Sequence, residues 1–221
     1  MRTKTSSFGV PLRESHDSSE FYKRRLYTSK REEAQDLAMI NEFPAEYLNQ
    51  VHHGDSRNLA FIPSNSIQLM ITSPPYNVGK EYDENLSLDE YLELLKSVMG
   101  EVYRVLIPGG RACVNVANVG RKPYIPFNHL VAQTMLELGF LMRGEIIWDK
   151  GASAGGSCAW GSWQSASNPV LRDVHEYILI FSKQSFRRED HKGENKKNTI
   201  SRDEFLEYTK SVWSFNSESA K

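Results

Sequence analysis

The chain has 221 residues, of which 39% are hydrophobic and 25% are charged, and its formal net charge is −1. This length suits one α/β domain with an appendage, and the near-neutral charge excludes a protein that is basic throughout. The two cysteines, Cys113 and Cys158, form no CxxC pair and no Cys/His cluster, which argues against a disulfide framework and a structural zinc site. Because the sequence has neither an apolar run of roughly 18 residues nor a secretory signal, we expect a cytoplasmic protein without a metal or a membrane partner.

The N-terminal part, residues 1–45, is polar and basic, and it predicts a loosely held tail followed by a helix near residues 30–41. Residues 46–183 carry the apolar periodicity of a catalytic α/β region, and residues 184–221 read as a charged segment with a C-terminal helix. Within the α/β region the first predicted strand is the short stretch "YLNQVHHGD", which ends at Gly54 and Asp55.

Strands and helices then alternate along the chain. Residues 66–72 form a continuous apolar run, which is typical of a strand buried on both faces. Helical spacing follows from Leu88 to Leu106, with Ser87 and Glu90 as a capping box and Pro108-Gly109-Gly110 as the stop. The later elements are the strand "RACVNVAN", the helix "PFNHLVAQTMLELGF" and the strands "MRGEIIWDK" and "HEYILIFSK". This order predicts an α/β fold with a mostly parallel, doubly wound sheet.

Polar residues fall at three of the predicted strand ends, namely Asp55, Ser73-Pro74-Pro75-Tyr76 and Asp149-Lys150. Ligands of doubly wound sheets bind at the carboxyl ends of the strands, so the sequence places the active site there.

Residues 151–173 interrupt the alternation with a Gly-, Ser- and Ala-rich stretch that contains Trp160 and Trp163. A loop of more than about 15 residues within a compact domain is usually functional or disordered, and the tryptophans argue against simple disorder. A last helix is predicted from residue 201, with Ser201 and Glu204 as a second capping box.

The stretch Ser73-Pro74-Pro75-Tyr76 suits one particular chemistry. A proline nitrogen has no hydrogen to donate, so the carbonyl groups and the Ser73 hydroxyl are available to accept hydrogen bonds from one –NH₂ group. Two such acceptors would localise the lone pair of an exocyclic amine on cytosine or adenine and favour its attack on a methyl group. Tyr76 would stack on the ring, which must be flipped out of the duplex at a cost of a few kcal/mol.

This motif and its surroundings resemble the DNA amino-methyltransferases that modify cytosine N4 or adenine N6. The similarity covers about residues 47–183 and includes "HGDSRNLAFIPSNSIQLMITSPPYN", "EVYRVLIPGGRACVNV", "GEIIWDKG" and "RDVHEYILIFSK". The resemblance implies a Rossmann-like fold and site-specific transfer of a methyl group from S-adenosylmethionine to duplex DNA, commonly in a restriction–modification system. The serine form of the motif is typical of cytosine-N4 enzymes, with adenine N6 as the alternative.

The resemblance also implies roles for single residues. The catalytic residues would be Ser73, Pro74, Pro75 and Tyr76, and Asp55 would lie near the cofactor unless it only satisfies its own turn. The expected DNA contacts are Asn77, Lys80, Lys150, Trp160, Trp163 and Arg172. For Asn77 a turn role, for Lys80 a solvated loop and for segment 151–173 a lid over the pocket are the alternatives.

The family pattern breaks near residue 221, where "SFNSESAK" resembles the start of a further segment, and no Gly-rich "DPFxGSGT" cofactor loop occurs. We therefore expect a sheet that is incomplete at its C-terminal end, little activity of the chain alone, and association with a complementary C-terminal half or with itself. A non-catalytic DNA-binding subunit and a methyltransferase of RNA or protein amides are the competing functions.

Overall fold

The computed structural model describes residues 22–27, 34, 36–79, 81, 85–151, 171–188 and 199–216. The chain forms two compact units, Met1–Glu32 and Glu33–Lys221, and every helix and strand named below belongs to the second. The predicted division at residues 45 and 183 remains a prediction. Within the part of the chain that the structure describes, no helix is long and apolar enough to cross a bilayer.

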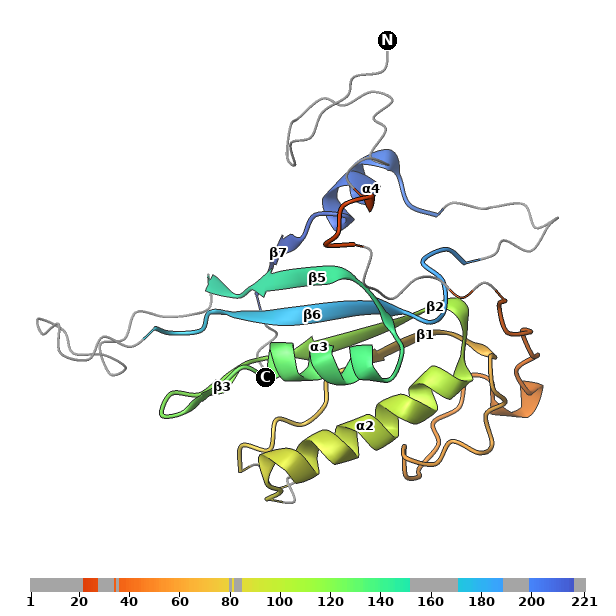
Figure 1. The fold of residues 1–221 in the computed structure, drawn as a ribbon, viewed down its shortest axis with the longest axis horizontal. Coiled ribbons are helices and arrows are strands. Elements are labelled where there is room, and N and C mark those ends of the chain that lie inside the picture. The colour runs from red at the N-terminus through yellow and green to blue at the C-terminus, as the bar shows by residue number, and fades with distance from the viewer. Residues whose placement is uncertain are drawn as a thin grey trace, which may run out of the picture. The chain divides into compact units, whose positions relative to one another are not determined.

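A five-stranded sheet forms the centre of the second unit, in the order β1-β2-β6-β5-β7 (Figure 1). Its strands are β1 (Ile67–Thr72), β2 (Leu106–Val116), β5 (Leu141–Asp149), β6 (His175–Ser182) and β7 (Val212–Ser214). The β1–β2 and β5–β7 pairs are parallel, but β6 is antiparallel to both β2 and β5. The α/β fold is as predicted, whereas the expectation of a mostly parallel sheet is corrected to a mixed one. A parallel β6 would need a crossover, usually a helix, and residues 151–173 show no helical period.

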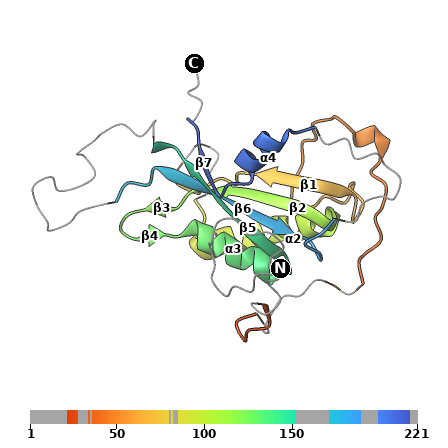
Figure 2. The ribbon, with the colours of Figure 1, turned by 90° about the horizontal axis from the view of Figure 1, so that it is seen from above.

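Two helices cover one face of this sheet, α2 (Leu88–Val105) and α3 (Phe127–Glu137), and α4 (Arg202–Tyr208) lies on the other side (Figure 2). Both predicted capping boxes are confirmed, at Ser87 with Glu90 and at Ser201 with Glu204. The smaller elements are η1 (Ala45–Tyr47), β3 (Val119–Gly120) and β4 (Tyr124–Ile125). Because α4 buries none of its residues, the core among the described elements lies on the side of α2 and α3.

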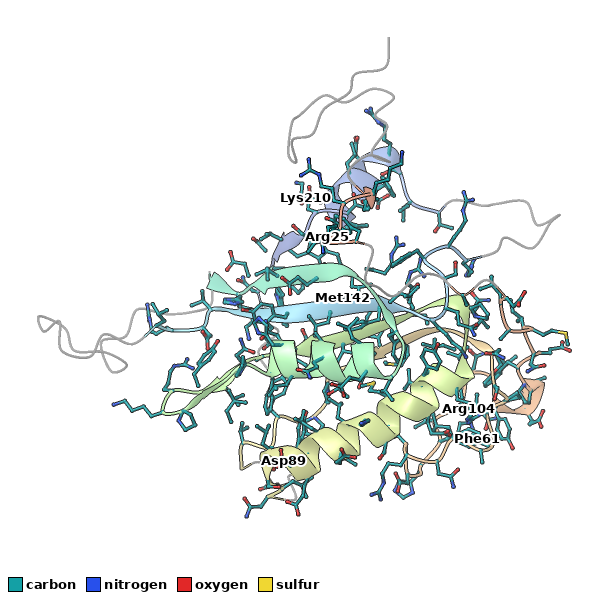
Figure 3. All side chains as sticks on the ribbon, in the orientation of Figure 1. Arg25, Phe61, Asp89, Arg104, Met142 and Lys210 are labelled. Carbon is teal, nitrogen blue, oxygen red and sulfur yellow. The ribbon has the colours of Figure 1, made fainter. Side chains whose placement is uncertain are left out.

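The core lies between the sheet and this helical layer. Its buried side chains are Leu95, Met99, Val102, Leu106, Ala112, Val114, Val116, Val131, Met135, Phe140, Leu179 and Phe181. Met142 on β5, labelled in Figure 3, packs against this cluster. Arg104 on α2 holds the loop that contains Phe61 against the helix by donating to the Ile62 carbonyl at 3.0 Å (Figure 3). Each large apolar side chain buried in this way contributes about 1.5–3 kcal/mol, so this core stabilises the sheet and the two helices against each other.

The opposite face of β1 is open. Leu69 and Ile71 remain 53% and 71% exposed, so the prediction that this strand is buried on both faces is wrong. Among the described residues β1 pairs only with β2, which leaves its outer edge without a hydrogen-bonded strand. An apolar edge strand of this kind is a ready template for another chain.

Three local predictions are wrong. Residues 48–55 form no strand, and the Tyr47 ring there packs edge to face on His52 and on Phe61. Residues 36–41 are not helical. The stretch Pro108–Gly110 lies within β2 rather than before it, at a point where the β1–β2 register shifts.

Lys183, directly after β6, is the one buried lysine of the described residues. Its ammonium group donates to Asn65 Oδ1 at 2.6 Å and to the Arg104 carbonyl at 3.1 Å. Burial, with the nearby charge of Arg104, lowers the pKa of Lys183 to about 8. The folded chain therefore releases this proton at lower pH than the unfolded chain does.

We expect the free energy of unfolding to rise with pH between about 8 and 10.4, where the unfolded chain binds more protons than the folded one. Between pH 7.5 and 9.5 the difference in stability between wild type and Lys183→Met should grow by about 2 kcal/mol in favour of wild type. Urea denaturation at both pH values measures this difference, and Lys210→Met, which removes an exposed lysine, is the matched control. A difference that stays constant with pH would contradict the prediction.

Candidate active site

The Ser73–Tyr76 stretch leaves β1 at its carboxyl end, where the register pairs Thr72 with Val114. Ser73 is exposed, while the ring of Tyr76 is half-buried and packs against the core. Three further polar side chains meet the motif there: Asn115 near the end of β2, Lys150 just after β5, and Glu176 near the start of β6.

Hydrogen bonds join these side chains. Asn115 Nδ2 donates to Glu176 Oε2 at 2.6 Å. The same nitrogen lies 3.5 Å from Ser73 Oγ and 3.5 Å from the Tyr76 hydroxyl oxygen. The Tyr76 hydroxyl donates to Glu176 Oε2 at 3.4 Å, and Lys150 Nζ donates to the other carboxylate oxygen. The predicted motif is thus joined to Asn115 of β2 and Glu176 of β6, and through Glu176 to Lys150.

Electrostatics keep the carboxylate ionised and the phenol neutral. Burial alone would raise the pKa of Glu176, but hydrogen bonds from Lys150 and Asn115 outweigh it and hold this pKa below its usual value. Burial raises the pKa of Tyr76, and the negative charge of Glu176 raises it further. At neutral pH Tyr76 therefore carries its proton and can donate it in a hydrogen bond to an anionic partner.

The exposed side of this arrangement suits a flat molecule that bears an amine. The Ser73 hydroxyl and the adjacent carbonyl groups supply acceptors, and the ring of Tyr76 supplies an aromatic surface beside them. A charged nucleophile or a metal is not required for this contact. Among the described residues, no group of three or more His, Cys, Asp or Glu side chains is arranged to hold a metal ion.

Two of the predicted DNA contacts have partners within the protein. Lys150 forms an ion pair with Glu176, so its ammonium group is turned toward the catalytic edge. Asn77, at a φ of 51°, donates its amide to the Leu86 carbonyl at 2.5 Å, which closes the loop after the motif. Arg172 is exposed, and its DNA contact remains a prediction. Lys80, Trp160 and Trp163 lie outside the described residues.

Asp55 does not lie at a strand end. Its carboxylate accepts from the backbone and the guanidinium of Arg57, with a shortest distance of 2.6 Å, and hydrogen bonds from Arg57 lower its pKa. This geometry is that of a turn aspartate, and its contact with a cofactor remains a prediction. Neither Asp55, already tied to Arg57, nor the open edge of β1 forms a cradle that fits S-adenosylmethionine among the described residues.

Asn115 and Glu176 are the site residues that sequence reasoning missed. The signal was present in "CVNVAN" and "HEYILIFSK", where one amide and one carboxylate interrupt runs of strand residues. Glu176 was missed because it lies near the start of a strand. Only the antiparallel direction of β6 brings the start of this strand to the edge of the sheet where β1 and β2 end.

Comparison with known proteins shows the family of the chain. A family model described as DNA methylase matches residues 67–221, which is more than half of the chain. The chain belongs to the N6/N4 DNA methylase family. M.MjaVI, a type II methyltransferase of Methanocaldococcus jannaschii, is 35% identical over 164 residues, covering 72% of this chain and 82% of that protein. M.BglII, a type II methyltransferase of Bacillus subtilis, is 27% identical over 218 residues, covering 90% of this chain and 58% of that protein.

Solved structures agree with this family. The N6/N4 methylase chain matches TTHA0409 of Thermus thermophilus, a DNA modification methylase in complex with S-adenosylmethionine, with a TM-score of 0.57 and 26% identity. That match covers 73% of this chain and 66% of the Thermus chain. PvuII cytosine-N4-specific DNA methyltransferase shares the fold, with a TM-score of 0.56 and 19% identity over 76% of this chain and 57% of that one.

These matches confirm three expectations from the sequence: the DNA amino-methyltransferase family, the methyltransferase fold, and S-adenosylmethionine as the cofactor. The chain spans roughly 57–66% of the length of M.BglII and of both solved relatives.

Proposed function

We propose that this chain is the catalytic part of a site-specific DNA methyltransferase that methylates the N4 amine of cytosine in duplex DNA, in a cytoplasmic restriction–modification system. S-adenosylmethionine supplies the methyl group. The observation that carries the proposal is the position of Ser73 and Tyr76 at the carboxyl end of β1, where Asn115 and Glu176 hold both side chains by hydrogen bonds.

The serine in the first position of the motif is the reason for preferring cytosine. Its hydroxyl accepts one hydrogen of the exocyclic amine, and a backbone carbonyl accepts the other. The base must leave the duplex to reach this edge, and stacking on Tyr76 offsets part of the cost of unstacking. Base–aromatic stacking contributes about 1–3 kcal/mol.

Mass spectrometry of nucleosides tests the substrate. DNA from cells that express the chain, with a complementary C-terminal segment supplied, should contain N4-methylcytosine, and DNA from cells with the Ser73→Ala variant should not. N6-methyladenine in its place would identify an adenine-N6 enzyme. The absence of both modified bases, with the protein present and folded, would refute a DNA methyltransferase.

The cofactor would be held from the side of β1 by a complementary segment that completes the sheet. The exposed Leu69 and Ile71 and the unpaired edge of β1 support this proposal, because an added strand would bury both side chains. We expect the purified chain to associate with such a segment, or with itself when the segment is missing. Light scattering distinguishes these states, and a monodisperse monomer would contradict the proposal.

A further inference from the structure

Four polar side chains form what we term the edge cluster: Tyr76, Asn115, Lys150 and Glu176. They come from the loop after β1, from β2, from the residue after β5 and from the start of β6. Glu176 lies at the centre, because its two carboxylate oxygens accept from the three other members.

The edge cluster is costly to build. The side chains of Glu176 and Lys150 are only 15% and 26% exposed, and a buried ion pair is often no more stable than an apolar pair of similar volume. The Asn115 Oδ1 atom is buried and has no donor among the described residues. Unsatisfied groups of this kind are rare in folded proteins and call for an explanation other than stability.

We propose that Glu176 is a positioning residue for the flipped base, an assignment that rests on the proposed function. Its carboxylate fixes the Tyr76 hydroxyl, and it also orients the Asn115 amide, which lies 3.5 Å from the Ser73 hydroxyl oxygen. Tyr76 and Ser73 contact the base, while Glu176 acts only through them. Lys150 donates to the other carboxylate oxygen of Glu176 and so prevents this carboxylate from rotating away from Tyr76 and Asn115.

The proposal makes the site depend on the charge of Glu176. The groups that face its carboxylate are Lys150 just after β5, Asn115 from β2 and Tyr76 from the loop after β1. A protonated Glu176 would lose acceptor capacity toward these donors, so the hydroxyl of Tyr76 would be released. The amine of Lys150 favours the ionised form, and its removal should bring the release to higher pH.

Nuclear magnetic resonance of ¹³C-labelled tyrosine measures how Tyr76 responds to the charge of Glu176, and it needs neither cofactor nor DNA. The Tyr76 ring signal, assigned with Tyr76→Phe, should follow the titration of Glu176 in wild type. It should titrate at a higher pH in Lys150→Met and should lose this titration in Glu176→Gln. Two control variants should leave the signal unchanged. Lys210→Met removes the exposed ion pair with Glu207, and Asp173→Asn removes the ion pair with Arg121. A Tyr76 signal that is the same in wild type and Glu176→Gln would overturn the proposal.

Kinetics give a second test once methylation is established. Glu176→Gln should lower kcat by about 10- to 100-fold, the usual loss for a hydrogen bond to a charged group, and should change KM for DNA less. Tyr76→Phe combined with Glu176→Gln should be no slower than the slower single variant, because both act through one hydroxyl. The acid limb of the kcat profile should move to higher pH in Lys150→Met.

Independent, multiplicative losses in the double variant, or an acid limb that does not move, would refute the positioning role. A wild type that stays inactive with a complementary C-terminal segment supplied would refute the proposed function instead, and the resonance result would still decide whether Glu176 controls Tyr76.

Discussion

Ser73→Ala and Tyr76→Ala should each lower the rate constant of methyl transfer by about 10²- to 10³-fold, the loss seen when one preorganised polar contact to a reacting group is removed. Ser73→Ala removes an acceptor for the amine. Tyr76→Ala removes both the stacking surface and the hydroxyl that Glu176 holds. Single-turnover incorporation of labelled methyl groups into DNA measures the rate constant in a preparation in which wild type is active.

Matched variants separate these effects from general damage. Ser97→Ala removes a hydroxyl that only donates to the Glu93 carbonyl on the exposed side of α2, and it should leave the rate unchanged within about twofold. Tyr76→Phe keeps the ring and should fall between wild type and Tyr76→Ala. Rates of Ser73→Ala and Tyr76→Ala equal to that of wild type would show that the reacting base binds elsewhere.

Gly109→Ala should destabilise the fold by about 3–5 kcal/mol, through overpacking and backbone strain together. Gly109 has a φ of 73°, and a Cβ added there would lie 2.6 Å from Arg188 Cα and closer still to the Arg187 carbonyl oxygen. Both are backbone atoms, so no side-chain rotation relieves the contact. The Gly109 amide donates to the Lys183 carbonyl at 2.8 Å, which holds this glycine against the segment that follows β6.

Urea denaturation of the purified variants measures this loss. Gly54→Ala is the control, because a Cβ at Gly54 would meet no atom within 4 Å, and its stability should stay within about 0.5 kcal/mol of wild type. Gly109→Ala with wild-type stability would mean that the segment after β6 packs differently.

Local signals made much of this fold predictable. The capping boxes at Ser87 and Ser201 begin α2 and α4, since a serine followed by a glutamate three residues later satisfies two otherwise unpaired amides. The end of β1 directly before Ser73 was equally predictable, because the two prolines that follow Ser73 have no amide hydrogen to continue the ladder of hydrogen bonds.

Non-local pairing was not predictable from such patterns. Strand direction depends on which neighbour is available, so the reversal of β6 and the pairing of β7 with β5 needed three-dimensional information. The exposure of Ile71 likewise depends on what covers the face of β1, and an apolar run does not say whether its cover lies in the same segment of chain.

The residues of the site were also predictable where they are contiguous in sequence and not where they come together only through the fold. Ser73 and Tyr76 stood out as a contiguous motif, whereas Asn115 and Glu176 lie 42 and 103 positions from Ser73. Contacts at such separations depend on the sheet order, which is set by the whole fold.

The antiparallel pairing of β5 with β6 brings together the two residues that flank segment 151–173, Lys150 and Val174. Asp149 pairs with His175, and the Lys150 amide donates to the Val174 carbonyl at 2.8 Å, so the intervening chain leaves and re-enters the sheet at one place. Its two ends are fastened by the same ion pair that orders the catalytic edge. The two ends of residues 151–173 are therefore held by the sheet itself. If this segment contacts DNA as the sequence predicts, target choice and chemistry can change independently, in evolution or by engineered replacement of the residues between Gly151 and Leu171.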